Sequence, residues 1–106
     1  MDAYFVYVTA KDLSEAKVLA RTVVTERLAA CANVLGSIQS VYWWDGKLCE
    51  DDEVALVLKT SEVRKNELIA RLREIHSYET PCITCLPIAD GNPDFLSWIV
   101  AETAVD

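Results

Sequence analysis

Residues 40–48 read Ser-Val-Tyr-Trp-Trp-Asp-Gly-Lys-Leu, and the Asp45-Gly46 pair predicts a β-hairpin with a two-residue turn. Both residues of a type I′ turn have positive φ, which the Asp-Gly dipeptide accommodates well. The turn then pairs residues 41–44 with residues 47–50 in antiparallel order. Three consecutive aromatic side chains are therefore expected at the tip of the hairpin: Tyr42, Trp43 and Trp44.

This hairpin is expected to be longer than the domain that carries it. A strand over residues 32–44, with a bulge or bend at Gly36, spans about 43 Å at roughly 3.3 Å per residue. A compact chain of 106 residues has a radius of gyration of only about 13 Å. Aromatic surface on an overhanging ribbon needs a partner, and the nearest partner is a second copy of the chain. We therefore expect the aromatic tip to lie at an interface between copies.

Composition predicts one soluble globular domain over residues 1–106. Hydrophobic residues make up 52% of the chain, and the net charge is −7. An acidic chain argues against nucleic acid and against anionic membrane surfaces as partners. No apolar run approaches the roughly 20 residues of a membrane span, and the Met-Asp-Ala start lacks the basic residues of a signal peptide. We expect a cytoplasmic protein.

The four cysteines raise the question of a disulfide or a zinc site. Cys82 and Cys85 have CxxC spacing, but they fall in a predicted strand, where three steps separate Cα atoms by about 10 Å and turn the side chains to opposite faces. A zinc site would need a second such pair or two histidines, and the chain has one histidine. We expect reduced, buried, inert thiols.

Periodicity and capping signals predict seven elements. Residues 4–9 form a strand, and Asp12 begins a helix with Glu15 in a capping box; this helix ends near Leu28. Residues 32–44 and 47–60 form the hairpin. Ser61 is the expected cap of a second helix, which stops before Pro81. Residues 82–88 form an edge strand that contains Pro87, and Asn92-Pro93 begins the last helix.

The order β-α-β-β-α-β with one appended helix predicts an α+β ferredoxin-like split βαβ sandwich with a long central hairpin. Its helices cover one face of an antiparallel sheet. The hairpin and the last helix, which carries Trp98, are the two devices that could cover the other face with a neighbouring subunit.

The sequence resembles the CutA family of divalent-cation-tolerance proteins over nearly its whole length. The resemblance rests on ERLAACAN at residues 26–33, SVYWW at 40–44 with Gly46-Lys47, Lys59-Thr60, His76, Tyr78, Glu79, Pro81, Leu86-Pro87, Gly91-Asn92-Pro93, Leu96 and Trp98. It implies a ferredoxin-like subunit in a tight homotrimer, with hairpins that reach across subunit boundaries. It also implies a link to copper and other divalent-metal tolerance, and a similarity to trimeric nitrogen-regulatory proteins, but no reaction.

This chain departs from the metal ligands suggested for copper-linked bacterial members of the family. Val8 and Ile75 stand where a cysteine and a first histidine would fall, so only His76 carries over. The candidate metal ligands that remain are His76, Glu79 and Cys31, and the candidate ions are copper and zinc, bound weakly.

Each candidate also has a structural interpretation. A histidine in the last turn of a helix can cap carbonyls without a ligand, and Cys31 can be a core thiol. Lys59 and Tyr78 could line a cleft between subunits, or they could serve packing. The acidic run at residues 50–53 alternates between strand faces, so its four carboxylates cannot surround one ion. It could attract cations weakly, but we expect a solvated strand whose charges discourage edge-to-edge aggregation.

Two functions remain open. The first is a homotrimer linked to divalent-metal (copper) tolerance that binds a divalent cation weakly. The second is a regulatory or scaffolding trimer, resembling the nitrogen-regulatory proteins, that binds a small molecule or a protein. We expect no enzyme, because no phosphate loop, nucleophile elbow or paired acid and base is visible.

Overall fold

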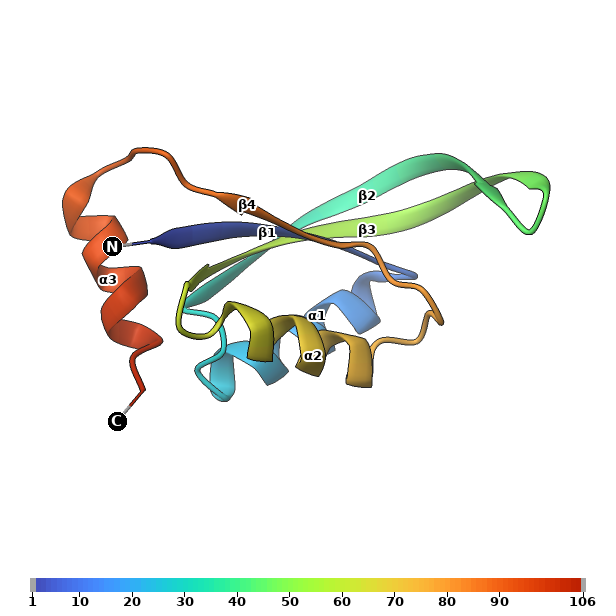
Figure 1. Ribbon diagram of the computed structural model, residues 1–106. Coiled ribbons are helices and arrows are strands. Elements are labelled where there is room, and N and C mark those ends of the chain that lie inside the picture. The colour runs from blue at the N-terminus through green and yellow to red at the C-terminus, as the bar shows by residue number, and fades with distance from the viewer. Residues whose placement is uncertain (1, 106) are drawn as a thin grey trace.

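The computed structural model of the protein describes residues 2–105 and has the α+β fold predicted from the sequence (Figure 1). The elements in chain order are β1 (Ala3–Ala10), α1 (Leu13–Thr25), β2 (Cys31–Trp44), β3 (Lys47–Ser61), α2 (Lys65–Ile75), β4 (Ile83–Pro87) and α3 (Pro93–Glu102). The sheet has the order β2-β3-β1-β4, and all neighbouring strands are antiparallel. The ferredoxin-like prediction and the edge position of β4 are confirmed.

The core lies between one face of the sheet and the helices α1 and α2, which Figure 1 shows side by side on that face. Val6 and Val8 of β1 alternate inward, as do Leu56 and Leu58 of β3, and all four are completely buried. Complete burial of such a side chain contributes about 1.5–3 kcal/mol to stability. The strand periodicity of two therefore fixes which face receives the helices.

Helix α1 begins at the predicted cap but ends earlier than predicted. Asp12 accepts a hydrogen bond from the Glu15 backbone N–H at 2.8 Å. The helix ends at Thr25, because Arg27 adopts a left-handed conformation (φ 60°) and the Leu28 N–H bonds back to the Val23 carbonyl at 2.9 Å. This is the 6→1 bond of a Schellman ending, with arginine where glycine is usual.

The prediction that Ser61 caps α2 was wrong. Ser61 is the last residue of β3 and pairs with Ala3, and its hydroxyl accepts a hydrogen bond from Thr103 at 2.7 Å. The helix starts at Lys65 after Arg64, whose side chain makes no capping hydrogen bond. Strand pairing thus extends β3 through the residue that local propensity assigns to a helix cap.

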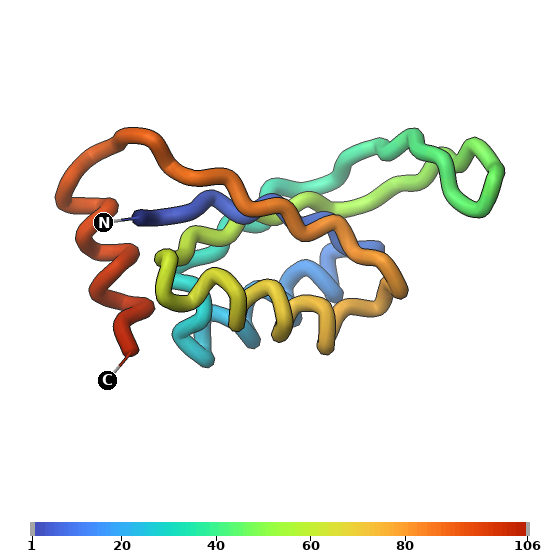
Figure 2. Tube along the Cα trace, viewed as in Figure 1, coloured from blue at the N-terminus to red at the C-terminus, as the bar shows by residue number. Residues whose placement is uncertain are grey.

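The hairpin has the predicted turn and register. Asp45 and Gly46 have φ of 51° and 74°, and the pairing runs from Trp44 opposite Lys47 outward. Strand β1 ends opposite Val54, so residues 38–53 extend beyond the rest of the sheet, along the 44 Å axis of the molecule (Figure 2). The predicted overhang is confirmed.

A bulge between Val34 and Gly36 decides which hairpin side chains face which way. Before the bulge, odd-numbered residues of β2 lie opposite odd-numbered residues of β3; Asn33, for example, lies opposite Val57. After the bulge, even-numbered residues of β2 lie opposite odd-numbered residues of β3; Tyr42, for example, lies opposite Cys49. Directly opposed residues share a face. The one-residue shift therefore turns Tyr42 and Trp44 to the sheet face opposite α1 and α2, which we call the open face.

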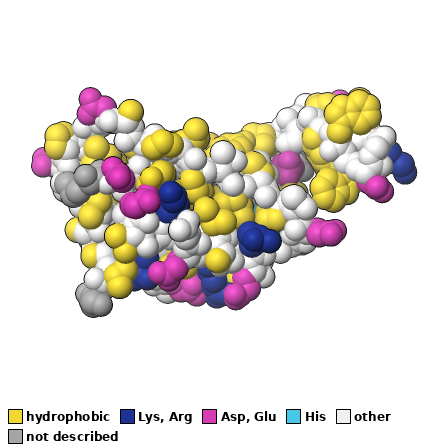
Figure 3. Space-filling view, in the orientation of Figure 1, with side chains coloured by type: hydrophobic (Ala, Val, Ile, Leu, Met, Phe, Trp, Pro, Cys, Tyr) yellow, Lys and Arg dark blue, Asp and Glu magenta, His cyan; other side chains and the backbone are white. Residues whose placement is uncertain are grey.

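The open face and the hairpin tip carry exposed apolar side chains. Phe5 and Leu86 are directly paired on the open face and are exposed. Trp43 at the tip is 73% exposed, and Figure 3 shows hydrophobic side chains gathered on that end of the molecule. Helix α3 packs at the opposite end of the sheet through its fully buried Ile99 (Figure 1).

Within residues 2–105, no helix combines the length and the apolar composition that crossing a membrane requires. All four cysteines are free. Cys85 packs against the core but is half-buried, as are Cys31 and Cys49, and Cys82 is exposed. The prediction of buried thiols was therefore wrong for Cys82, and it holds only in part for the other three.

Candidate functional site

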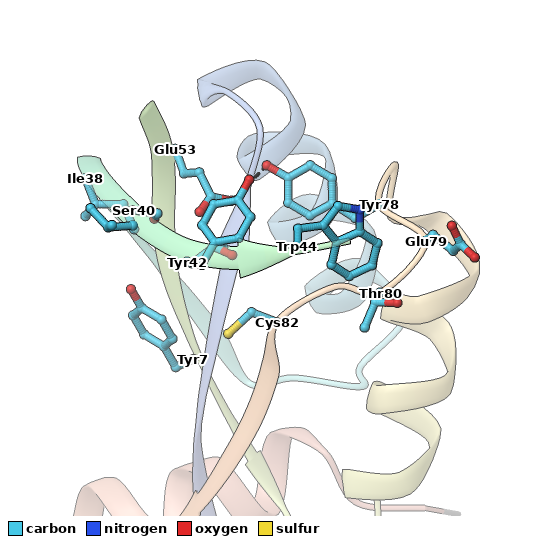
Figure 4. Close-up of a pocket in the computed structure, with 12 residues that line it drawn as sticks. Tyr7, Ile38, Ser40, Tyr42, Trp44, Glu53, Tyr78, Glu79, Thr80 and Cys82 are labelled. Atoms are coloured by element: carbon cyan, nitrogen blue, oxygen red, sulfur yellow. Dashed lines mark hydrogen bonds between the residues drawn. The ribbon is translucent and has the colours of Figure 1, made fainter. Parts of the chain in front are cut away.

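A cleft of about 650 Å³ lies between the hairpin and the loop that joins α2 to β4; we call it the hairpin cleft (Figure 4). β1, β2, β3 and the loop all contribute to its wall. The residues that line it are Tyr7, Thr9, Ile38, Ser40, Val41, Tyr42, Trp44, Glu53, Tyr78, Glu79, Thr80 and Cys82.

Four aromatic side chains dominate this wall: Tyr7, Tyr42, Trp44 and Tyr78. They come from three separate parts of the chain, namely β1, the outer part of β2 and the loop between α2 and β4. Tyr42 and Trp44 reach the cleft only because the bulge at Gly36 turns them to the open face, which also carries Tyr7. The cleft is thus a consequence of the bent hairpin.

Tyrosine hydroxyls and carboxylates pair along the cleft. The Tyr78 hydroxyl donates to Glu53 Oε2 at 2.8 Å, and the Tyr42 hydroxyl donates to Asp51. Burial and the bond to Glu53 raise the pKa of Tyr78, and the bond to Asp51 raises the pKa of Tyr42 to about 12. Both hydroxyls therefore stay protonated at neutral pH and act as donors.

The charge of the hairpin cleft is negative. Glu53 and Glu79 line it, and the twelve lining residues include no lysine, arginine or histidine. The expectation of a fully solvated acidic run was wrong for Glu53, which is half-buried and holds Tyr78. The cleft therefore favours cationic or neutral occupants over anionic ones.

His76 is a buried structural residue at the end of α2. Its Nε2 lies 2.7 Å from the Thr9 carbonyl oxygen, and its Nδ1 accepts the Tyr78 backbone N–H at 3.0 Å. These two bonds require a neutral ring with the proton on Nε2. The pairing of β4 with β1 ends at Val8. His76 therefore hydrogen-bonds the carbonyl of Thr9, the first residue of β1 beyond that pairing. It thereby positions Tyr78 in the cleft.

Glu15 supports the same loop from α1. Its carboxylate accepts the Lys11 N–H at 3.0 Å and the Ser77 N–H at 2.9 Å, and it lies 4.0 Å from His76 Nδ1. Burial alone would raise the pKa of Glu15, but the hydrogen bonds from Lys11 and Ser77 outweigh it and lower that pKa. Sequence analysis identified Glu15 only as a capping residue.

Glu15→Gln is expected to reduce stability at neutral pH by about 1 kcal/mol and to flatten its fall in acid. Because the folded-state pKa of Glu15 is lowered, its stabilisation is fully present above the unfolded value of about 4.3 and is lost as pH falls through the folded value. Denaturant unfolding from neutral pH to about pH 3 measures both effects. Glu67→Gln, an exposed carboxylate of α2, is the control; equal pH profiles for Glu15→Gln and the parent would contradict the assignment.

The structure does not bring the three candidate metal ligands together. Both ring nitrogens of His76 have partners in the chain, whereas Glu79 lines the hairpin cleft. Cys31 pairs with Lys59 opposite Phe5, about 13 Å along β1 from Thr9. No group of three His, Cys, Asp or Glu within residues 2–105 is arranged to hold a metal ion. Metal binding at these residues stays a prediction that would require His76 to exchange a partner.

Lys59 and Tyr78, the two candidate cleft residues, lie in different places. Tyr78 lines the hairpin cleft, whereas Lys59 lies toward the other end of the sheet and donates to Asn33. The neighbouring Cys31 thiol has a raised pKa, because burial outweighs the attraction of the Lys59 charge. A thiol that stays protonated is a weak nucleophile, in agreement with a packing role for Cys31.

The candidate interface residues occupy two ends of the molecule. Tyr42, Trp43 and Trp44 are all exposed on the hairpin, and Trp98 is 39% exposed on α3, where its ring stacks on Phe95 at 5.5 Å. Figure 1 shows α3 and the hairpin tip at opposite ends of the long axis. One copy therefore presents two separate apolar patches.

Sequence analysis missed most of the hairpin cleft. Tyr7, Ser40 and Glu53 were assigned to strands without a site, and Thr80 was not considered. For Glu53 the sequence showed only that it faces opposite to its neighbour Asp52 in the strand, not that its face is the one that carries the cleft. The approach of the loop at Tyr78 carries no local signal, since it depends on the tertiary bonds of His76 and Glu15.

Comparison with known proteins agrees with this geometry. Residues 4–102 match the family described as CutA1 divalent ion tolerance protein. The divalent-cation tolerance protein CutA of Pyrococcus horikoshii is 43% identical over 98 residues, which cover 92% of this chain and 95% of that protein. The solved structure of CutA from Xylella fastidiosa has a TM-score of 0.94 at 36% identity and covers 98% of this chain and 100% of its own. A structure from Archaeoglobus fulgidus, named as a periplasmic divalent cation tolerance protein CutA, has a TM-score of 0.92 at 37% identity, covering 96% of this chain and 99% of that one. With its family match and its identities to these relatives, the chain belongs to the CutA1 divalent ion tolerance protein family.

Proposed function

We propose that this protein acts as a homotrimer in tolerance of divalent metals, copper included, and that the hairpin cleft is its binding site. The observation that carries the proposal is the cleft itself, in which aromatic rings and carboxylates from three parts of the chain meet. The names of the family and of the matched relatives describe tolerance to divalent ions and no reaction. The proposal accordingly contains no catalytic step.

The trimer accounts for apolar surface that one copy leaves uncovered. Trp43, Trp44 and Leu48 are each more than half exposed at the hairpin tip, and Phe5 and Leu86 are exposed on the open face. Several exposed large apolar side chains gathered on one element are typical of an interface. Burial of the hairpin and of Trp98 against neighbouring copies would cover the patches at both ends of the long axis.

A cytoplasmic location is part of the proposal. Four free thiols, one of them exposed at Cys82, fit a reducing compartment better than an oxidising one. The Archaeoglobus fulgidus relative is named as periplasmic; the location proposed for this chain rests on its own free thiols.

Weak binding of a divalent cation is proposed for the carboxylates of the cleft, in preference to His76. Glu53, Glu79 and the Cys82 thiol all line it, and oxygen and sulfur donors are ligands for copper or zinc. Because residues 2–105 contain no ready group of three such ligands, the ion would keep most of its water. The affinity is therefore expected to be low.

Glu53→Gln together with Glu79→Gln is expected to weaken Cu(II) or Zn(II) binding about tenfold or more, because both formal charges of the cleft are removed. Calorimetric titration with the divalent ion, without reductant, measures this. The matched control is Glu50→Gln, a carboxylate opposite Val41 on the other hairpin face. If His76→Gln abolished binding while the cleft variants kept it, the ion would belong to His76, as sequence analysis proposed.

A second candidate function is a regulatory trimer that responds to a small molecule. The observation in its favour is the size of the cleft, since about 650 Å³ is far more than one metal ion occupies and lies within the range of small-molecule sites. Native mass spectrometry of protein purified without added metal would reveal a retained molecule directly.

A further inference from the structure

We infer that the hairpin cleft takes a small organic cation, an ammonium group with an apolar body, as its ligand. The inference rests on the proposed function in one respect only, the choice of this cleft as the binding site. It adds the chemical class of the ligand, which follows from the residues that line the cleft.

The first step is the aromatic wall. Tyr7, Tyr42, Trp44 and Tyr78 all line one cavity, and Figure 4 shows their rings around the open space. The face of an aromatic ring carries negative charge density and attracts an ammonium group within about 6 Å of its centre. Elsewhere in this chain such a pair exists, with Lys65 Nζ lying 4.3 Å from the centre of the Tyr4 ring.

The second step is the sign of the charge. Glu53 and Glu79 line the cleft, and no cationic side chain is among the lining residues. Asp51 adds a third carboxylate next to the cleft, because it accepts the hydrogen bond of the Tyr42 hydroxyl. Glu53 and Asp51 each accept a tyrosine hydroxyl, so each carboxylate increases the electron density of the ring that it holds. An anionic ligand would meet these carboxylates without a counter-charge, and it is excluded on that ground.

The third step is the size and shape of the ligand. A bare divalent ion would lack a group of three ligands within residues 2–105. A cavity of about 650 Å³ with Ile38 in its wall beside the aromatic rings fits an apolar body attached to the charge. An organic monocation satisfies the rings, the carboxylates and the apolar surface together.

Choline and its uncharged isostere 3,3-dimethylbutan-1-ol are the probes, because they have the same shape and differ in charge. Amide chemical-shift titration of the ¹⁵N-labelled full chain gives both the affinity and the location of binding. Choline is expected to bind at least about tenfold more tightly than the isostere, with shifts at residues 40–44 and 78–80. Equal affinities, binding of neither probe, or shifts elsewhere would overturn the inference.

Two variants and a control refine the test. Glu53→Gln keeps an acceptor for Tyr78 and removes the charge, so it should weaken choline about tenfold and leave the isostere unchanged. Trp44→Leu should weaken choline more than the isostere. Glu50→Gln removes the same charge from the opposite hairpin face and should change neither; an effect equal to that of Glu53→Gln would mean general charge attraction and would contradict the inference.

Sedimentation of the same samples separates this inference from the proposed assembly. Selective choline binding by a monomer would overturn the trimer and support the ligand class. Equal binding of both probes by an intact trimer would overturn the ligand class alone.

Discussion

Trp43→Ala and Trp44→Ala are each expected to weaken self-association by about 2 kcal/mol or more, roughly 30-fold in the dissociation constant. Both side chains are more than half exposed on a hairpin that extends past the end of β1, so one copy alone gains little from them. Truncating a buried interfacial aromatic residue removes contact area that no other group replaces. Sedimentation equilibrium measures the effect, and the melting temperature should become more dependent on concentration.

The two tryptophans also distinguish assembly from ligand binding. Trp44 lines the hairpin cleft and Trp43 does not, because adjacent strand residues face opposite ways and the bulge at Gly36 puts Trp44 on the open face. Trp43→Ala should therefore weaken assembly. It should change the affinity for choline only as far as loss of the assembly changes the cleft. Val18→Ala, an exposed change on the outer side of α1, is the control and should leave the assembly unchanged. Parent-like association of both tryptophan variants would show that the hairpin is not an interface.

His76→Ala is expected to destabilise the fold by about 3 kcal/mol and to disorder the loop that carries Tyr78. The side chain is completely buried, and its removal leaves the Thr9 carbonyl and the Tyr78 N–H without partners. The sequence left His76 open as a metal ligand or as a residue that caps carbonyls in the last turn of a helix; the structure shows its side chain fully buried. Denaturant unfolding measures the free energy, and the Tyr78 amide resonance reports the loop.

His76→Gln supplies the matched control, because its amide can still donate to the Thr9 carbonyl. It should recover part of the lost stability. Unchanged stability in His76→Ala would contradict the structural role and would return His76 to the candidate metal ligands.

The hairpin could be predicted residue by residue because its information is local. Asp45-Gly46 sets the turn, the turn sets the register, and Gly36 marks the bulge; each was expected from the sequence and is present. The N-cap bond at Asp12 is local in the same way, although the Glu15 carboxylate accepts the Lys11 N–H and not the Asp12 N–H of the predicted capping box. Such features depend on backbone sterics within a few residues.

The facing of the hairpin could not be predicted, because a bulge changes the parity of every residue beyond it. Whether Trp43 or Trp44 reaches the open face depends on the bulge's position relative to β3, which only the pairing determines. The hairpin cleft follows from that facing. Its other wall depends on His76, which sequence analysis recognised as a helix terminus but not as the link between the loop and β1.

The errors at Ser61 and Leu28 have different physical causes. Local capping propensity favoured a helix start at Ser61, but Ser61 pairs with Ala3 in the sheet. Boundary residues satisfy local signals and distant partners at once, and the distant partner prevails when it supplies a full strand ladder. Helix α1 ends three residues before Leu28, at Thr25, because the local Schellman ending with Arg27 at positive φ terminates it.

Native mass spectrometry of the full chain, purified without added metal, tests the central claim most directly, because it reports the number of subunits and any retained ligand in one spectrum. The account predicts a species of three times the chain mass of 11.8 kDa, and a cationic small molecule that Glu53→Gln releases. A spectrum containing only the single chain at micromolar concentration would contradict it.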